Sequence, residues 1–267
     1  MAETVRLAVA QTPPIPGDVA VNLERIDALA ARAAQSEADL LVLPEMVLTG
    51  YAIGAEQARA LAESADGPSA RRIAGIARSH GVAIAYGYPR LAPGGAVHNA
   101  AALINDEGAQ VLNYAKTHLF GDVDAGQFAA GEALPTTAQW RGWSVGLAVC
   151  YDVEFPEVGR WLADAGADLV LVPTANMSGF DEVSRLLVPA RALENGMFVA
   201  YANFCGSDAR FDYGGLSVVA GPDGKLLAEA GRGEELLFAT LDPAALSAAR
   251  ERYTYLADRR QNLHPGP

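Results

Sequence analysis

The stretch GLAVCYDVEFPE, residues 146–157, decides how this chain folds. An apolar run over residues 145–149 ends on a thiol, Cys150, and polar residues and a proline follow at once. This pattern is typical of a strand that brings a side chain to the edge of a sheet, with a helix beginning just beyond it. Pro156 suits the first turn of that helix, because the N–H group that proline lacks would have no partner there. Backbone N–H groups at such a helix start can hold a developing oxyanion, whereas the alternative interpretation is a buried and inert cysteine.

Length and composition indicate an enzyme-sized chain with a large core. Its 267 residues are 51% hydrophobic and 19% charged, which leaves enough apolar material for one large α/β domain. The only two cysteines, Cys150 and Cys205, argue against a disulfide framework and are typical of a reducing compartment. Glu3 and Arg6 interrupt the first apolar run, and no run approaches the roughly 18 apolar residues of a membrane span. We therefore expect a cytoplasmic protein without a membrane partner.

The net charge of −12 argues against nucleic acid as a partner. It comes from 32 acidic against 20 basic residues, and Lys and Arg form no cluster beyond the pairs Arg71–Arg72 and Arg259–Arg260. A phosphate-binding surface needs such clusters. The histidines do not have the spacing of metal ligands, and we therefore predict no metal. They are His80, His98, His118 and His264.

Strands and helices alternate along the chain, and no repeat or linker divides it. Asp18 can cap a helix that runs to about Gln35. This alternation, with several hairpins, indicates a large mixed sheet system covered by helices. We expect one domain over residues 1–267, with a long loop over 117–134 and an extension from about residue 253 that includes His264. Apolar patterns predict strands over residues 5–10, 40–43, 82–86, 99–104, 110–114, 138–140, 144–149, 168–172, 198–202, 216–220 and 226–229, and further helices over 55–63, 69–80 and 181–194.

Three reactive side chains each follow a predicted strand, and together they are the groups that a thiol-dependent hydrolase needs. Glu45 follows the run 40–43, Lys116 follows the strand 110–114, and Cys150 follows the run 145–149. Glu45 can accept the thiol proton, Cys150 can attack a carbonyl carbon and Lys116 can stabilise the oxyanion, which are the tasks of thiol-based acyl transfer. An ammonium also favours a thiolate beside it. Taken singly, Glu45 could cap a helix and Lys116 could be a solvated charge, but the joint occurrence indicates a hydrolase.

The strings around these residues resemble the signature of the nitrilase superfamily of carbon–nitrogen hydrolases. The resemblance covers nearly the whole chain and implies a four-layer α-β-β-α sandwich, usually assembled into at least a homodimer. It also implies a catalytic set of Glu45, Lys116 and Cys150 that needs no cofactor. The strings that carry the resemblance are PE at 44–45, KTHLF at 116–120, CYD at 150–152, RALEN at 191–195, with an expected structural role, and YLADRR at 255–260.

Many members of this superfamily place a second glutamate eight residues after the lysine, where this chain has Asp124. Its carboxylate is shorter by one methylene, yet it can still orient Lys116 or the substrate amide. Asp122 is a nearby competitor for this supporting role.

The mechanism that the resemblance implies is acyl transfer through a thioester. Glu45 accepts the proton of Cys150, and the thiolate attacks the amide carbon. Lys116 and the backbone N–H of Tyr151 hold the oxyanion. Protonated Glu45 passes its proton to the leaving ammonia, and water activated by Glu45 hydrolyses the thioester.

Within the superfamily the chain resembles 5-aminopentanamidases and related R-stereoselective amidases. This implies a small aliphatic carboxamide substrate like 5-aminopentanamide. A cationic amine needs a carboxylate away from the reacting carbon, and Glu154 is the first candidate, with Asp181 second. Glu154 could equally be a charge favoured by the helix dipole. Asn176 and Tyr51 are further candidates for substrate binding, against roles in a turn and in packing. The strings behind this resemblance are LTGYAIG at 48–54, YGYP at 86–89, VPTANM at 172–177 and YANFCG at 201–206.

Other interpretations stay open at this point. A nitrilase would release the acid from a nitrile, and an N-carbamoyl amine hydrolase would release carbon dioxide as well as ammonia. A papain-like hydrolase would pair Cys150 with His118. A non-catalytic interaction module is the remaining class, although the joint presence of Glu45, Lys116 and Cys150 counts against it. Cys205 is expected to be a core residue.

Overall fold

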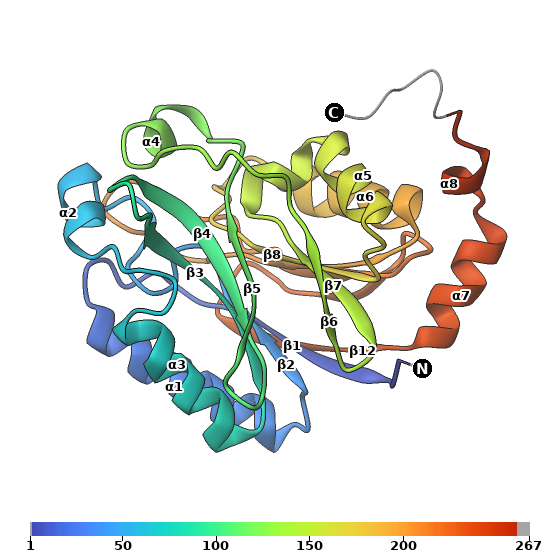
Figure 1. The fold of residues 1–267 in the computed structure, drawn as a ribbon, viewed down its shortest axis with the longest axis horizontal. Helices are drawn as coiled ribbons and strands as arrows, with labels where there is room; N and C mark the ends of the chain where they lie inside the picture. The colour runs from blue at the N-terminus through green and yellow to red at the C-terminus, as the bar shows by residue number, and fades with distance from the viewer. Residues whose placement is uncertain (1, 261–267) are drawn as a thin grey trace.

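Two six-stranded β-sheets pack face to face in the computed structural model, which describes residues 2–260 (Figure 1). In spatial order, the first sheet consists of β12 (Glu235–Leu241), β1 (Val5–Gln11), β2 (Leu40–Val42), β3 (Ala83–Leu91), β4 (Val97–Ile104) and β5 (Gln110–Ala115). The second consists of β11 (Leu226–Glu229), β10 (Val218–Ala220), β9 (Phe198–Ala202), β8 (Leu169–Pro173), β7 (Trp143–Leu147) and β6 (Thr137–Trp140).

The central strands of each sheet run parallel, so their carboxyl ends lie at the same edge. In the first sheet β1, β2 and β3 are parallel, with Val42 opposite Ala85. In the second sheet β7, β8 and β9 are parallel. Strands buried on both faces are nearly continuous apolar runs, which is why they could be predicted from sequence. Glu45 follows β2 and Cys150 follows β7, so each lies just beyond the carboxyl end of a central strand.

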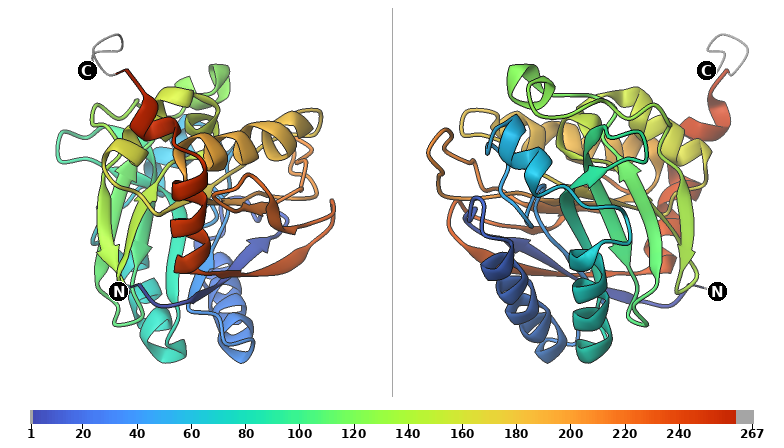
Figure 2. Two further views of the ribbon diagram at one scale, coloured as in Figure 1. Left: turned by 90° about the vertical axis from the view of Figure 1, so that its right-hand side faces the viewer. Right: turned by 60° about the vertical axis from the view of Figure 1, so that its left-hand side comes forward.

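Two helix pairs cover the outer faces of the sheets. α1 (Val19–Gln35) and α3 (Pro68–His80) lie on the first sheet, while α5 (Pro156–Asp164) and α6 (Val188–Asn195) lie on the second (Figures 1 and 2). Asp18 caps α1 by accepting from the Val21 N–H at 3.0 Å, as predicted. The predicted four-layer α-β-β-α sandwich is confirmed. No helix in the described part of the chain is long and apolar enough to cross a membrane.

Alternate residues of the strands fill separate cores, because successive side chains of a strand point to opposite faces. On β2, Leu40 and Val42 point into the layer between the two sheets. Leu41, between them, packs instead against the helices on the outer face of the first sheet. Tyr201 belongs to the corresponding core under α5 and α6. The apolar side chains thus hold all four layers together.

Several elements differ from the sequence-based expectation. The long loop predicted over 117–134 contains a short helix, α4 (Gly121–Ala125). The helix expected over 55–63 is shorter and forms α2 (Ala55–Ala60). The helix predicted over 181–194 contains a π-helical segment, η2 (Val183–Leu187), directly before α6. β12 and α7 (Pro243–Arg252) were not expected. β12 pairs with β1 along its whole length, and such a distant partner leaves little local signal.

The C-terminal part of the described chain packs on the protein's own surface, and the extension expected from about residue 253 begins directly after α7. α7 lies beside the sheets (Figure 2), and Arg250 binds the carbonyl of Gly196 at 2.9 Å and Asp168 at 2.8 Å. After it comes α8 (Tyr255–Asp258), and Arg259 forms an ion pair with Asp164 at 2.9 Å. His264 lies outside the described residues.

Candidate active site

Glu45 lies in the turn after β2, where the two sheets meet. Its side chain is fully buried, and its backbone N–H donates to the carbonyl of Thr174, just beyond β8, at 3.2 Å. The Asn99 amide, from β4, donates to Glu45 Oε1 at 2.6 Å. Gly87 on β3 passes so close that a Cβ atom there would lie 2.4 Å from the backbone nitrogen of Met46. A glycine is needed for this approach, and the carboxylate is therefore fixed from three sides.

Lys116 follows β5 and holds a fully buried ammonium between two carboxylates. Its Nζ atom lies 2.9 Å from Glu45 Oε1 and 2.6 Å from Asp124 Oδ2. The centroid of the Tyr51 ring lies 6.0 Å from Nζ. A buried charge is tolerated when it is paired and hydrogen-bonded, and both conditions hold here.

Cys150 begins a 3₁₀ turn, η1 (Cys150–Glu154), between β7 and α5. Its φ of 47° lies in a region that residues other than glycine rarely adopt and that is often found at functional sites. α5 starts at Pro156, as the sequence predicted. The N–H of Tyr151 lies in the first turn of η1, where helical N–H groups have no acceptor within the helix. It can therefore donate to a ligand at the thiol.

Burial decides the protonation states of these groups. It raises the pKa of the Cys150 thiol well above its ordinary value, and the Glu45 charge adds to this, whereas Lys116 and the Ala175 N–H oppose it. Burial also raises the pKa of the Glu45 carboxyl, against the Lys116 ammonium. Burial alone would lower the pKa of Lys116, but Glu45, Cys150 and Asp124 raise it well above its ordinary value. Burial thus opposes the favourable effect of the ammonium on a thiolate, which makes a base for the thiol proton more important.

Asp124 in α4 lies where the second carboxylate was expected. It is fully buried, and its Oδ2 accepts from Lys116 Nζ and from the Phe120 N–H at 2.9 Å. Asp122, the competitor, is exposed. Two buried oxygens, Asp124 Oδ1 and Glu45 Oε2, have no hydrogen-bond partner within residues 2–260. Buried acceptors without partners are costly, so each of these two oxygens is available to a donor that enters the site.

Glu154, the first candidate for binding a substrate amine, lies at the end of η1 and is half-buried. Its backbone carbonyl accepts from Arg191, but its carboxylate has no hydrogen bond or ion pair in the described chain. Burial raises its pKa, the Lys116 charge lowers it and Glu182 raises it. Asp181, the second candidate, is instead neutralised by Arg232 at 2.6 Å and by a second arginine. Of these two candidates, only Glu154 has a carboxylate without an ion-pair partner within residues 2–260.

Tyr51 and Asn176 lie beside the site, and their side chains differ in their hydrogen-bond partners. Tyr51 is fully buried, and burial raises its pKa well above the ordinary value, so its hydroxyl stays protonated. The Asn176 amide donates to the carbonyl of Phe180 at 3.1 Å, and its backbone N–H donates to the Asn203 side chain at 2.7 Å. Asn176 thus holds the loop after β8, and its contact with substrate stays a prediction.

His118 has partners that leave it apart from the thiol. Its ring stacks on Phe155 at 4.0 Å between centroids, and its Nδ1 lies 2.9 Å from Asp152 Oδ1. Among the residues that the structure describes, no hydrogen bond or ion pair connects the His118 ring with the Cys150 thiol. The geometry therefore does not support the Cys–His pair considered from sequence.

The RALEN string has the expected structural role. Arg191 pairs with Glu194 at 2.9 Å and donates to the backbone carbonyls of Val153 at 3.0 Å and Glu154 at 2.8 Å. This guanidinium therefore holds the turn that carries the nucleophile. Cys205 is 2% exposed and is a core residue, as predicted.

Sequence reasoning missed Asn99 and Gly87. Both lie inside strands, one as a buried polar residue within an apolar run and one as a glycine within a strand. Each residue departs from the apolar, β-branched pattern that is typical of a buried strand. Such departures often mark a functional or close-packed position. This signal was present, but the partner of each residue could not be named without the fold.

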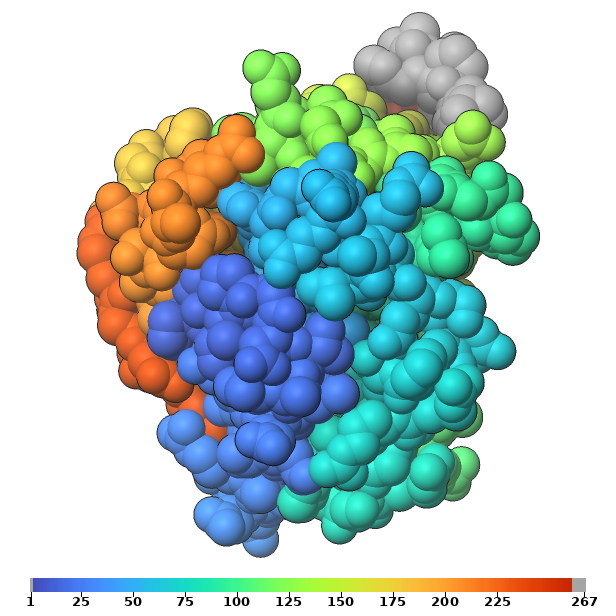
Figure 3. Space-filling view, turned by 90° about the vertical axis from the view of Figure 1, so that its left-hand side faces the viewer, coloured from blue at the N-terminus to red at the C-terminus, as the bar shows by residue number. Residues whose placement is uncertain are grey.

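Loops from both sheets close over the site. The N–H of Gly54, at the start of α2, donates to Gln127 Oε1 beyond α4 at 2.7 Å. Thr12, after β1, forms a bridge with Phe204, after β9. Figure 3 shows the surface of α2 in cyan, below α4 in green and beside the segment around residue 210 in orange. These contacts join loops of the two sheets around the buried site.

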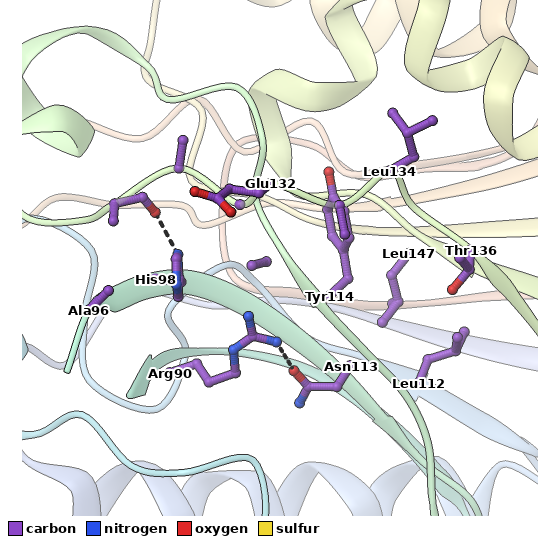
Figure 4. A pocket seen from close by; sticks show the side chains of 15 residues that line it. Arg90, Ala96, His98, Leu112, Asn113, Tyr114, Glu132, Leu134, Thr136 and Leu147 are labelled. Carbon is purple, nitrogen blue, oxygen red and sulfur yellow. Dashed lines mark hydrogen bonds between the residues drawn. The ribbon is translucent and has the colours of Figure 1, made fainter. Parts of the chain in front are cut away.

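A separate cavity of about 480 Å³ lies over β4 and β5 (Figure 4). Arg90 donates to Asn113 Oδ1 at 2.7 Å on its floor, and His98 Nδ1 lies 2.8 Å from the Ala129 carbonyl. Tyr114 lines this cavity, but its hydroxyl donates to Asp152. The lining includes none of the predicted catalytic residues. Within residues 2–260, no group of three His, Cys, Asp or Glu side chains is placed to hold a metal ion.

Comparisons with known proteins agree with this geometry. The family model for carbon-nitrogen hydrolases matches residues 6–251. The chain is 50% identical, over 98% of its length, to a Pseudomonas protegens protein named hydrolase in pqqF 5′ region, of which it covers 91%. It is 39% identical, over 92% of its length, to an (R)-stereoselective amidase from a Pseudomonas species, of which it covers 88%.

A solved structure has the same fold. It is the amidase from Nesterenkonia sp. AN1 in complex with acrylamide, as a double mutant with glutamate changed to glutamine and cysteine to alanine. Its TM-score is 0.84 at 38% sequence identity, covering 97% of this chain and 95% of that one. The chain therefore belongs to the carbon–nitrogen hydrolase family of the nitrilase superfamily and is an amidase that hydrolyses amide carbon–nitrogen bonds.

Proposed function

We propose that this amidase cleaves a small aliphatic carboxamide with a distal ammonium, such as 5-aminopentanamide, to the carboxylic acid and ammonia. The observation that carries the proposal is the half-buried Glu154 carboxylate, which has no cationic partner in the described chain and lies on the same turn as Cys150. A partly desolvated carboxylate binds an ammonium better than an exposed one. The amine of the substrate would supply the missing partner.

Glu45 acts as the base and acid of this reaction. Its Oε1 is held by Lys116 and Asn99, which leaves Oε2 to take the thiol proton of Cys150. A carboxyl whose pKa is raised by burial is suited to accept a proton and later return it. The thiolate then adds to the amide carbon, Glu45 protonates the departing ammonia, and water that Glu45 activates hydrolyses the thioester.

The charge that develops on the substrate oxygen meets donors that are already in place. Lys116 is fixed by its two carboxylates, and the N–H of Tyr151 lies in the first turn of η1. Donors that need no rearrangement stabilise such an oxyanion strongly. The amide NH₂ group donates to Asp124 Oδ1, the buried oxygen without a partner.

The test is ammonia release from 5-aminopentanamide beside uncharged pentanamide, with Cys150→Ala as the inactive control. We expect a preference for the amine that Glu154→Gln removes, by about 10- to 150-fold in kcat/KM, the range for a hydrogen bond to a charged group. Glu157→Gln is the matched control, because Glu157 is exposed on α5. Equal turnover of both amides would contradict the cation-binding role, and turnover of nitriles or N-carbamoyl amines alone would contradict the substrate class.

Assembly and location belong to the same proposal. The family resemblance supports at least a homodimer, and the two free cysteines suit a cytoplasmic location. Light scattering coupled to gel filtration measures the first, and fractionation of cells measures the second. A monomer at micromolar concentration would contradict the dimer.

A further inference from the structure

We propose that Asp152 is a positioning residue that sets the spacing between Lys116 and Cys150. The proposal rests on the proposed function, in which these two side chains act on the same substrate carbonyl. Asp152 is fully buried in η1 and does not itself face the substrate in the proposed mechanism. Its carboxylate acts through the two segments that it joins.

Four donors and one histidine ring nitrogen converge on this carboxylate. Oδ2 accepts from the Val149 N–H at 3.1 Å and the Tyr114 hydroxyl at 3.0 Å. Oδ1 accepts from the Thr117 hydroxyl at 3.1 Å and the His118 N–H at 3.0 Å, and the His118 ring Nδ1 lies 2.9 Å away. Both oxygens are therefore saturated, as a buried carboxylate requires.

The donors lie on either side of the lysine in the chain. Tyr114 comes two residues before Lys116, and Thr117 comes directly after it. The backbone of Lys116 is otherwise held by the carbonyl of Asn99 and the N–H of Gly131, both at 2.8 Å. Asp152 is thus the group that ties this strand end to the turn of the second sheet.

The same carboxylate encloses the nucleophile. The Val149 N–H donates to Asp152 Oδ2, and the Asp152 N–H donates back to the Val149 carbonyl at 3.0 Å. Cys150 lies inside this reciprocal pair, with its unusual φ of 47°. Such a conformation persists when the surroundings over-determine it, and these two bonds are the local restraint on it.

Asparagine cannot replace this carboxylate. Its side chain offers one acceptor oxygen, and its NH₂ group would face donors from either Val149 and Tyr114 or Thr117 and His118. A shift of Lys116 relative to Cys150 then follows. Misplacement of reacting groups by about 1 Å can cost on the order of 100-fold in rate.

The experiment compares Asp152→Asn with wild type for kcat, KM, Tm and the rate of Cys150 alkylation by iodoacetamide as a function of pH. We expect kcat to fall about 100-fold, KM to change by less than about 3-fold, and the alkylation profile to move to higher pH, because Lys116 no longer favours the thiolate. Asp168→Asn is the matched control, since that carboxylate joins Ser144 to Arg250 on β7 and α7, and it should lower Tm alone.

A folded Asp152→Asn enzyme with wild-type kcat and alkylation profile would overturn the proposal. If that variant does not fold, Tyr114→Phe and Thr117→Val remove one donor each, and we expect each to lower kcat about 10-fold at constant KM. Unchanged kcat and alkylation in both would overturn it equally. Iodoacetate, which has no amide group, serves as a second alkylating reagent, so a wild-type protein that cleaves no amide refutes the proposed function and still leaves the positioning role measurable.

Discussion

Replacement of Asp124 by asparagine should separate the two tasks of this carboxylate, which are holding Lys116 and receiving the substrate amide. Oδ2 accepts from Lys116 Nζ at 2.6 Å and from the Phe120 N–H at 2.9 Å, while Oδ1 is buried without a partner in the described chain. An asparagine can keep both donors on its carbonyl oxygen, which puts its NH₂ group in the place of Oδ1. The side chain keeps its size, so the fold survives. The substrate amide, however, meets a donor where it needs an acceptor.

The size of the effect follows from the bond that is lost. A hydrogen bond to a charged group contributes about 1.5–3 kcal/mol. At about 1.4 kcal/mol for each factor of ten, kcat/KM should fall about 10- to 150-fold. Stability should change less, because the Lys116 ammonium keeps Glu45 at 2.9 Å and the buried charge is not left alone.

The assay is ammonia release under kcat/KM conditions, with Tm measured on the same samples. Asp122→Asn is the matched control, since it makes the same chemical change on an exposed position of the same helix. We expect wild-type kinetics from Asp122→Asn. An Asp124→Asn enzyme that keeps kcat/KM within about 3-fold of wild type, at unchanged Tm, would refute the role of Oδ1 as the amide acceptor.

Three further predictions concern pH and packing. Glu45 must be ionised to act as a base, so kcat/KM should fall with acid at a pH above that of an ordinary glutamate, because burial raises its pKa; Asp124→Asn should move this limb to lower pH, since the Asp124 charge raises the pKa of Glu45. Lys116→Met should abolish ammonia release, and its Tm should decline as pH rises, because burial raises the pKa of the Glu45 carboxyl, which then favours folding only while it is protonated. Gly87→Ala should cost about 1–3 kcal/mol in denaturant unfolding, whereas Gly75→Ala in α3, with no atom within 4 Å of the new Cβ, should gain up to about 1 kcal/mol.

Much of the fold could be predicted because its signals are local. The central strands are apolar runs, since both faces are buried, and Asp18 and Pro156 mark helix starts through their own backbone chemistry. Glu45 and Cys150 stood out because each breaks the apolar pattern where a strand ends. α4 and β12 were missed for the opposite reason. α4 has only five residues, and β12 depends on pairing with a strand more than 220 residues away in the chain, with Val5 opposite Leu241.

The chemistry of the site depends on burial, and burial is a property of the whole fold. The sequence places an ammonium and a thiol in the same site, and on charge alone the ammonium favours a thiolate. The structure surrounds the thiol with apolar layers and adds the Glu45 carboxylate, and burial then raises the pKa of Cys150 despite Lys116. Burial therefore strengthens the need for a base at the thiol, the role that the proposed mechanism gives to Glu45. The sequence alone could not decide between the two influences on this thiol, because the balance between burial and the lysine charge depends on how the layers pack around the site.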